Sequence, residues 1–134
     1  MTAMVQSLTD CTVLVVDDDY YLAECTCEAL WEAGATVLGP YGSEADVLVC
    51  LSHTLPGYAV LDLNLGSGLS FGLAREMKAL GIPTLLVTGY DESIIPPDIA
   101  DLPCLQKPVT GNMLIVAVIS LVGRDRGGRS TAST

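Results

Sequence analysis

Short apolar runs alternate with longer segments of helical spacing along this chain. The apolar runs are Thr12–Val16, Ala35–Leu38, Ala59–Leu61, Thr84–Val87 and Pro103–Leu105. They show no alternation of apolar with polar positions, and several are rich in Val, Leu and Ile, as strands buried on both faces of a sheet are. The pattern therefore predicts five buried strands.

The spacing between these runs predicts helices. Apolar positions from Leu22 to Ala33 recur at helical intervals, and Gly34 ends that segment. Ser43, Ser70 and Thr110 are placed to cap three further helices. The side chains expected to pack inward include Trp31 of the first helix and Leu48 of the second.

The alternation of strands and helices predicts a parallel sheet with helices on both faces. Five strands in a chain of this length favour an α/β, flavodoxin-like, doubly wound fold with strand order 2-1-3-4-5. The fourth crossover, residues 91–102, departs from the pattern, because Pro96, Pro97 and the following Pro103 oppose a regular helix. We therefore expect an irregular or degenerate fourth helix.

The length of 134 residues suits one domain with one hydrophobic core. We expect residues 1–10 to form an N-terminal extension, 11–123 the domain, and 124–134 a disordered tail after a last helix that ends near Gly123. The first segment lacks the basic and apolar regions of a signal peptide. The most apolar stretch, Leu114–Val122, is far shorter than the roughly 20 residues that a membrane span needs. These features predict a soluble, cytoplasmic protein.

The charge and the cysteines exclude several classes of function. Sixteen Asp and Glu oppose six Lys and Arg, which gives a formal net charge of −10. So acidic a protein repels phosphate backbones and anionic membrane surfaces, so we expect neither nucleic acid nor membrane as a partner. The five cysteines form no CxxC pair, and His53 is the single histidine, so neither a disulfide framework nor a zinc site is expected.

Polar residues stand where four of the apolar runs stop. Asp17, Asp18 and Asp19 follow the first run, Asp62 ends the third, Thr88 ends the fourth, and Lys107 follows the fifth. In the order 2-1-3-4-5 these four strands are consecutive neighbours, about 4.8 Å apart. The side chains therefore gather at the carboxyl edge of the sheet, where ligands bind in open α/β folds.

These groups suit phosphoryl transfer assisted by a metal. Carboxylates forced together repel by about 4 kcal/mol per pair at 4 Å in an effective dielectric of 20, so either their pKa values rise or a cation lies among them. Oxygen ligands without His or Cys favour Mg²⁺. A carboxylate can attack phosphorus, while a lysine and a hydroxyl supply charge and a hydrogen bond to the transferring group. Each group alone also has a structural interpretation, as a helix cap or a turn, but their joint placement favours function.

The same residues resemble the receiver signature of response regulators in two-component signalling. Val13–Asp19 resembles the acidic end of the family's first strand, and Val60–Asn64 resembles its phosphoacceptor strand. Thr88 matches the family's hydroxyl, and Lys107-Pro108 matches its lysine–proline pair. The likeness covers residues 11 to about 122, nearly the whole chain.

The resemblance implies a specific function. Asp62 would accept a phosphoryl group from a sensor histidine kinase, with Thr88 and Lys107 beside it. Mg²⁺ or Mn²⁺ would be held by Asp17, Asp18, Asp62 and the carbonyl of Asn64. The protein would not be an enzyme for other substrates: it would catalyse only its own phosphorylation and dephosphorylation, and would signal through contacts with a downstream protein partner.

The later motifs show a narrower resemblance and one departure from the receiver family. Asp62–Gly66 and Val87–Tyr90 resemble stand-alone response regulators with a Phe-Ala-Thr-Gly-Tyr-like motif, although Leu86-Val87 replaces Phe-Ala. Receiver domains usually carry Tyr or Phe three residues before the lysine, where this chain has Cys104. We expect Cys104 to be a core residue, with a redox role as the alternative.

Two other classes of protein share part of the pattern. Phosphatases of the haloacid-dehalogenase type use a similar set of residues, but they carry a second Asp two residues after the nucleophile, where this chain has Asn64. A pseudo-receiver that binds partners without phosphorylation is the other alternative, which the intact acidic group opposes. Met113–Ile119 in the last helix is apolar around most of its circumference, so we also expect a homodimer or kinase docking through that helix.

Overall fold

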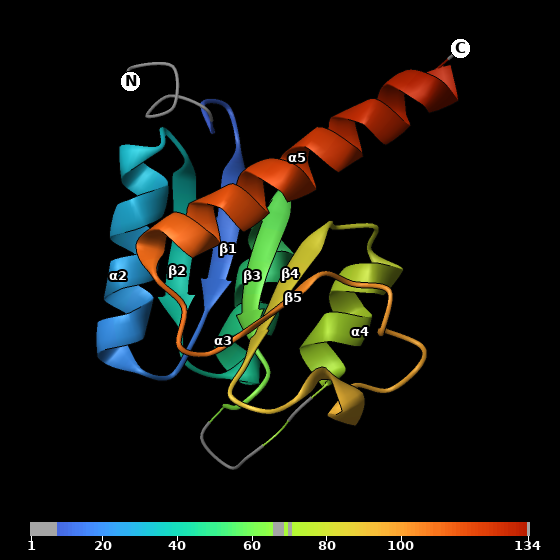
Figure 1. Ribbon diagram of the computed structural model, residues 1–134. Coiled ribbons are helices and arrows are strands. Elements are labelled where there is room, and N and C mark those ends of the chain that lie inside the picture. Colours follow the sequence, from blue (N-terminus) through green and yellow to red (C-terminus); the bar gives the residue numbers. More distant parts are fainter. Residues whose placement is uncertain (1–7, 66–68, 70, 134) are drawn as a thin grey trace.

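The computed structural model describes residues 8–65, 69 and 71–133. Five parallel strands form one sheet in the order β2-β1-β3-β4-β5 (Figure 1). Their bounds are β1 Thr12–Val16, β2 Thr36–Tyr41, β3 Tyr58–Asp62, β4 Thr84–Thr88 and β5 Cys104–Gln106. The predicted fold class and strand order are confirmed.

The helices cover both faces of this sheet. Their bounds are α2 Tyr20–Glu32, α3 Glu44–His53, α4 Gly72–Ala79, the 3₁₀ turn η1 Glu92–Ile94, and α5 Gly111–Ser133. Helices α2 and α5 pack on one face, and α3 and α4 pack on the other (Figure 1). Strands β3 and β4 are buried at every position, which explains why their sequences show no polar alternation. In the part of the chain that the structure describes, every helix is too short or too polar to cross a bilayer.

Local signals place the helix ends much as the sequence predicted. The Ser43 hydroxyl accepts a hydrogen bond from the Asp46 amide at 3.2 Å, and the Thr110 hydroxyl accepts one from the Met113 amide at 3.1 Å. Gly34 follows α2 with a φ of 97°, the left-handed conformation in which glycine ends helices. The third predicted cap, Ser70, lies outside the described residues.

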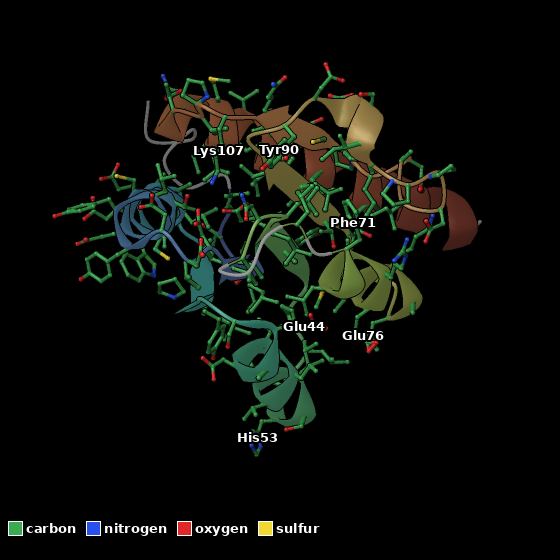
Figure 2. All side chains as sticks on the ribbon, turned by 90° about the horizontal axis from the view of Figure 1, so that it is seen from below. Glu44, His53, Phe71, Glu76, Tyr90 and Lys107 are labelled. Carbon is green, nitrogen blue, oxygen red and sulfur yellow. The ribbon has the colours of Figure 1, made fainter. Side chains whose placement is uncertain are left out.

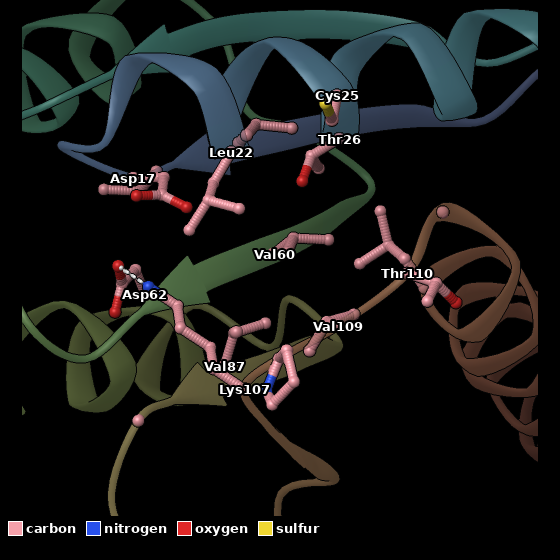
Figure 3. A pocket seen from close by; sticks show the side chains of 16 residues that line it. Asp17, Leu22, Cys25, Thr26, Val60, Asp62, Val87, Lys107, Val109 and Thr110 are labelled. Atoms are coloured by element: carbon pink, nitrogen blue, oxygen red, sulfur yellow. Dashed lines mark hydrogen bonds and ion pairs between the residues drawn. The ribbon is translucent and has the colours of Figure 1, made fainter.

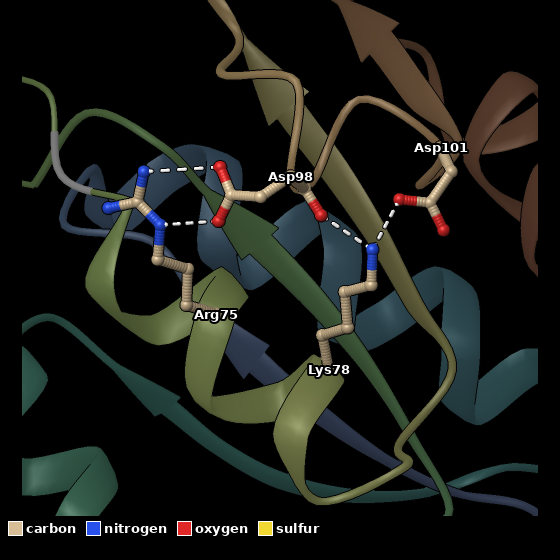
Figure 4. A network of polar contacts seen from close by, with 4 residues as sticks. All are labelled: Arg75, Lys78, Asp98 and Asp101. Atoms are coloured by element: carbon tan, nitrogen blue, oxygen red, sulfur yellow. Dashed lines mark hydrogen bonds and ion pairs between the residues drawn. The ribbon is translucent and has the colours of Figure 1, made fainter.

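The fourth crossover is irregular, as Pro96 and Pro97 predicted. Across residues 89–103, all of them described, η1 is the only helical element, and hydrogen-bonded turns cover residues 97–101. Polar contacts tie this crossover to α4 (Figure 4). Arg75 pairs with the Asp98 carboxylate through Nε at 2.7 Å and through a second nitrogen at 3.3 Å. Lys78 Nζ donates to the Asp98 carbonyl at 2.5 Å and to the Asp101 carboxylate at 2.7 Å.

Both ends of the domain differ from the sequence-based boundaries. The last helix continues to Ser133 instead of ending near Gly123, so residues 124–133 are helical where a disordered tail was predicted. A glycine costs a helix only about 1 kcal/mol, and the turn before Gly123 is anchored by the buried side chains of Leu121 and Val122. Leu8, assigned to the N-terminal extension, is fully buried, and its amide donates to the Ala33 carbonyl at 2.8 Å.

Two predicted packing residues are instead exposed. Trp31 is 55% exposed and Leu48 is 46% exposed. Each follows a fully buried neighbour, Leu30 or Val47, by one residue. One residue is a turn of about 100° around a helix, so each side chain faces away from the sheet.

Candidate functional site

The carboxyl ends of β1, β3, β4 and β5 bring the predicted residues together. Figure 2 looks at this edge of the sheet from below, and Lys107 and Tyr90 lie over the strand ends there. The Lys107 amide donates to the Thr88 carbonyl at 2.7 Å, which continues the pairing of β4 with β5 past its last residue. The parallel pairing therefore fixes where Lys107 leaves the sheet.

Asp62 is the buried carboxylate of this edge. It ends β3 and is only 4% exposed. Its Oδ2 accepts from Lys107 Nζ at 2.8 Å, and its Oδ1 accepts from the Asn64 amide at 2.9 Å. Both oxygens are thus held in place by hydrogen-bond donors.

Three carboxylates gather beside Lys107, and we call this group of four residues the acidic site. Asp17, Asp18 and Asp62 each offer an oxygen, and these atoms all lie within 4.8 Å of one another. Burial raises the pKa of Asp17 to about 6, and the charge of Asp62 adds to this effect, against the hydrogen bond that Asp17 accepts from the Asp19 amide. A cation would relieve this repulsion.

The donor set of the acidic site fits a hard divalent cation. It consists of carboxylate oxygens from two adjacent strand ends, which are the ligands that Mg²⁺ and Mn²⁺ prefer. Three of the four predicted metal ligands, Asp17, Asp18 and Asp62, therefore lie together. The fourth, Asn64, follows Asp62 by two residues in the sequence. The role of the Asn64 carbonyl stays a prediction. Asp19, the third acidic residue after β1, instead caps α2 by accepting from the Leu22 amide at 3.1 Å.

A lysine and a hydroxyl complete the site. Burial of the Lys107 ammonium disfavours its charge, but the hydrogen bond and charge of Asp62, with the nearby Asp17, outweigh this and raise the pKa of Lys107. Lys107 therefore stays a cation at neutral pH. Thr88 is fully buried at the end of β4, and its hydroxyl accepts from the Tyr90 amide at 3.0 Å. The hydroxyl proton remains a donor for a group above the strand ends.

A pocket beside the acidic site was not anticipated from the sequence. It lies between α2, the sheet and the start of α5 (Figure 3). Its walls come from segments that are far apart in the sequence, such as Thr26, Val60 and Val109. No local motif marks such a cavity, because only the packing of α2 against the β5–α5 loop creates it.

Comparison with known proteins gives matches among solved structures. No protein-family model matches the sequence, and no curated protein matches it significantly. SdrG from Sphingomonas melonis Fr1 is similar at 28% identity and a TM-score of 0.72, over 87% of this chain and 98% of that chain. The chemotaxis response regulator CheY4 of Vibrio cholerae is similar at 18% identity and a TM-score of 0.72, over 84% of this chain and 99% of that one.

A longer protein shares the same fold over part of its length. The response regulator PhyR from Brucella abortus superposes with a TM-score of 0.80 at 16% identity. The match covers 98% of this chain and 56% of that chain, so this chain spans little more than half of PhyR.

Proposed function

We propose that this chain, whose fold is that of response-regulator receiver domains, accepts a phosphoryl group on Asp62 in a Mg²⁺-dependent reaction. The observation that carries the proposal is the buried Asp62 carboxylate, held at 2.8 Å from Lys107 Nζ beside two further carboxylates. A structural ion pair has no need of Asp17 and Asp18 beside it, because like charges in close contact are destabilising.

The chain's own residues account for the chemistry of the transfer. An oxygen of Asp62 attacks the phosphorus atom of a donor, and a new O–P bond forms. The bond between phosphorus and the donor's leaving group breaks, and its electron pair departs with that group. Lys107 then pairs with a phosphoryl oxygen in place of the Asp62 carboxylate, and the Thr88 hydroxyl donates to another.

The metal would be held by Asp17, Asp18 and Asp62, with the Asn64 carbonyl as a further ligand. Mg²⁺ or Mn²⁺, when bound, supplies positive charge that offsets the carboxylates and the incoming phosphoryl oxygens. Asp17 orients the site through the hydrogen bond that it accepts from Asp19.

The donor we propose is a sensor histidine kinase, and the output is contact with a downstream protein in the cytoplasm. The formal net charge of −10 supports a protein partner over nucleic acid. The chain would not act as an enzyme on other substrates, since its nucleophile is consumed at each turnover until the aspartyl-phosphate is hydrolysed.

A binding module that is never phosphorylated is the second candidate. It is favoured by Cys104, which stands where receiver domains usually carry an aromatic residue. A phosphatase is less well supported, because Asn64 occupies the position of that class's second Asp.

One experiment separates the three functions. The full chain is incubated with acetyl phosphate and Mg²⁺, and intact mass and free phosphate are followed. We expect one added phosphoryl group, which is lost in Asp62→Asn because an amide does not attack phosphorus. Asp10→Asn is the matched control, since Asp10 is exposed near the amino end of β1 and its positive φ of 70° suits Asn. Phosphate release without any added phosphoryl mass would indicate a phosphatase, and an unchanged mass without phosphate release would indicate a binding module.

A further inference from the structure

The pocket beside the acidic site has the size of a small-molecule site. Its volume is about 430 Å³, within the range of roughly 300–1,000 Å³ typical of ligand pockets. Leu22 and Thr26 line it from α2, Val60 and Val87 from the sheet, and Val109 from the loop before α5. Three separate parts of the fold therefore enclose it.

The pocket has one charged end and an aliphatic body. Asp17 and Asp62 lie together at one end in Figure 3, and Lys107 Nζ is already paired with Asp62 at 2.8 Å. The side chains of Leu22 and Val60 lie beyond this end, and the Thr26 hydroxyl points into the space between α2 and the sheet (Figure 3). A charged group placed among the aliphatic side chains would lose its hydration without gaining a partner.

We propose that this pocket binds an uncharged, largely apolar small molecule that carries one hydroxyl or carbonyl group. Its apolar part lies against Leu22, Val60 and Val109, and its polar group forms a hydrogen bond with the Thr26 hydroxyl. With a divalent cation in place, the three carboxylates and Lys107 of the acidic site sum to no net charge, so no excess charge at the pocket's end selects an ion. This site does not depend on phosphoryl uptake.

Nuclear magnetic resonance titration of the full chain with 1-hexanol tests the proposal. Hexanoate and hexylamine have the same chain length and carry opposite charges, and all three titrations are run with millimolar Mg²⁺. We expect 1-hexanol to shift the amide resonances around Thr26, Val60 and Val109, with the two ions binding at least about tenfold more weakly. No shift up to the solubility limit of 1-hexanol, or equal binding of either ion, would overturn the proposal.

Variants at Thr26 locate the site. Thr26→Met fills the cavity and should abolish 1-hexanol binding, whereas Thr26→Val keeps the shape and should weaken binding about three- to tenfold through loss of the hydrogen bond. Val49→Met is the matched control, because Val49 is 61% exposed on α3, on the opposite face of the sheet. Should Thr26→Met fail to fold, Thr26→Val carries the test.

Two outcomes at this step overturn the proposal. One is an unchanged 1-hexanol affinity in the Thr26 variants that fold. The other is loss of 1-hexanol binding as protein concentration rises, which would mean that a second copy fills the pocket. Phosphoryl uptake by the unaltered chain is measured separately. Its failure would remove the proposed function and leave the 1-hexanol result standing.

Discussion

Lys107 and Asp62 form an ion pair whose two members differ greatly in burial. The Asp62 side chain is 2% exposed and the Lys107 side chain is 26% exposed. The buried carboxylate thus depends on the partly exposed lysine for the hydrogen bond to its Oδ2 and for a neighbouring positive charge. Removing the lysine leaves a desolvated carboxylate without its cation, although the hydrogen bond from the Asn64 amide remains.

Lys107→Met should therefore destabilise the metal-free protein by about 1–3 kcal/mol. Urea unfolding at pH 7 measures this. Lys78→Met is the matched control, because Lys78 also forms an ion pair but its side chain is 43% exposed. Exposed pairs contribute about 0–1 kcal/mol. Equal losses in the two variants would show that burial of Asp62 does not govern the pair.

Asp17 makes the stability of the metal-free protein depend on pH. Burial and the neighbouring Asp62 raise its folded-state pKa from 3.8 to about 6. Its contribution to stability is therefore fully present below pH 4 and is lost as pH rises through 6.

We expect Mg²⁺ to stabilise the protein more at pH 7 than at pH 5, because at pH 7 Asp17 is ionised and the cation offsets its charge. Melting temperatures with and without millimolar Mg²⁺ at the two pH values measure the effect. Na⁺ at matched ionic strength controls for screening. A Mg²⁺ effect that is equal at both pH values would place Asp17 outside the metal site.

Cys104 behaves as a core residue more than as a redox sensor. Burial raises the pKa of its thiol to about 11, and the charge of Glu92 adds to this. Almost no thiolate is present at pH 7, and the thiolate is the reactive form. Its side chain packs with the apolar layer beneath α3 and α4.

At the scale of elements, the fourth crossover is anchored as well as irregular. The sequence led us to expect an irregular or degenerate fourth helix here. In the structure Ile95 is 9% exposed and Ile99 is fully buried. The contacts of Arg75 and Lys78 hold the same segment to α4 from outside. Any rearrangement must therefore begin near Tyr90, whose amide bonds to the Thr88 hydroxyl.

We predict that activation loosens this crossover locally, from Tyr90 to Ser93, because the Thr88 hydroxyl, which accepts from the Tyr90 amide, shifts when it donates to a phosphoryl oxygen. Amide hydrogen exchange with and without beryllofluoride measures it. Arg75→Gln should speed exchange around Asp98 in both states, whereas Arg124→Gln, an exposed arginine on α5, should leave it unchanged. Identical protection of residues 90–93 in both states would contradict this coupling.

At the scale of the whole molecule, α5 and the edge strand β5 leave an apolar surface uncovered. Val116 is 58% exposed and Met113 is 43% exposed. Both line a hollow with Leu105 of β5. The homodimer expected from the sequence fits this surface. Val116 is more exposed than Ile119, which is half-buried, so Val116 is the position to test.

Val116→Glu should raise the dissociation constant of the dimer at least about tenfold, because it places a charge in an apolar interface. Analytical ultracentrifugation across a wide concentration range measures this. Val49→Glu, at a similarly exposed position on α3, should leave the association unchanged. A monomer at every concentration in the unaltered chain would leave kinase docking as the role of this surface, testable with the same two variants.

The sequence by itself determined the sheet order and most of the acidic site. Strands buried on both faces must be continuously apolar, so β1, β3 and β4 stand out in the sequence. Parallel topology then puts every carboxyl end at one edge, which predicts that Asp62 and Lys107 meet. The distance of 2.8 Å between Lys107 Nζ and Asp62 Oδ2 agrees with this prediction, which needs only the order of strands and helices along the chain.

Only the tertiary structure decided which role each residue takes within its element. Three consecutive aspartates follow β1, and the direction of each side chain assigns Asp17 and Asp18 to the cluster and Asp19 to the cap of α2. Leu8 became core because long-range packing outweighs local propensity. Helix α5 ran on past Gly123 because a glycine costs a helix only about 1 kcal/mol. The pocket behind the acidic site likewise exists only where α2, the sheet and the β5–α5 loop meet. These three parts of the fold are distant from one another in the sequence, and no local pattern along the chain predicts the cavity between them.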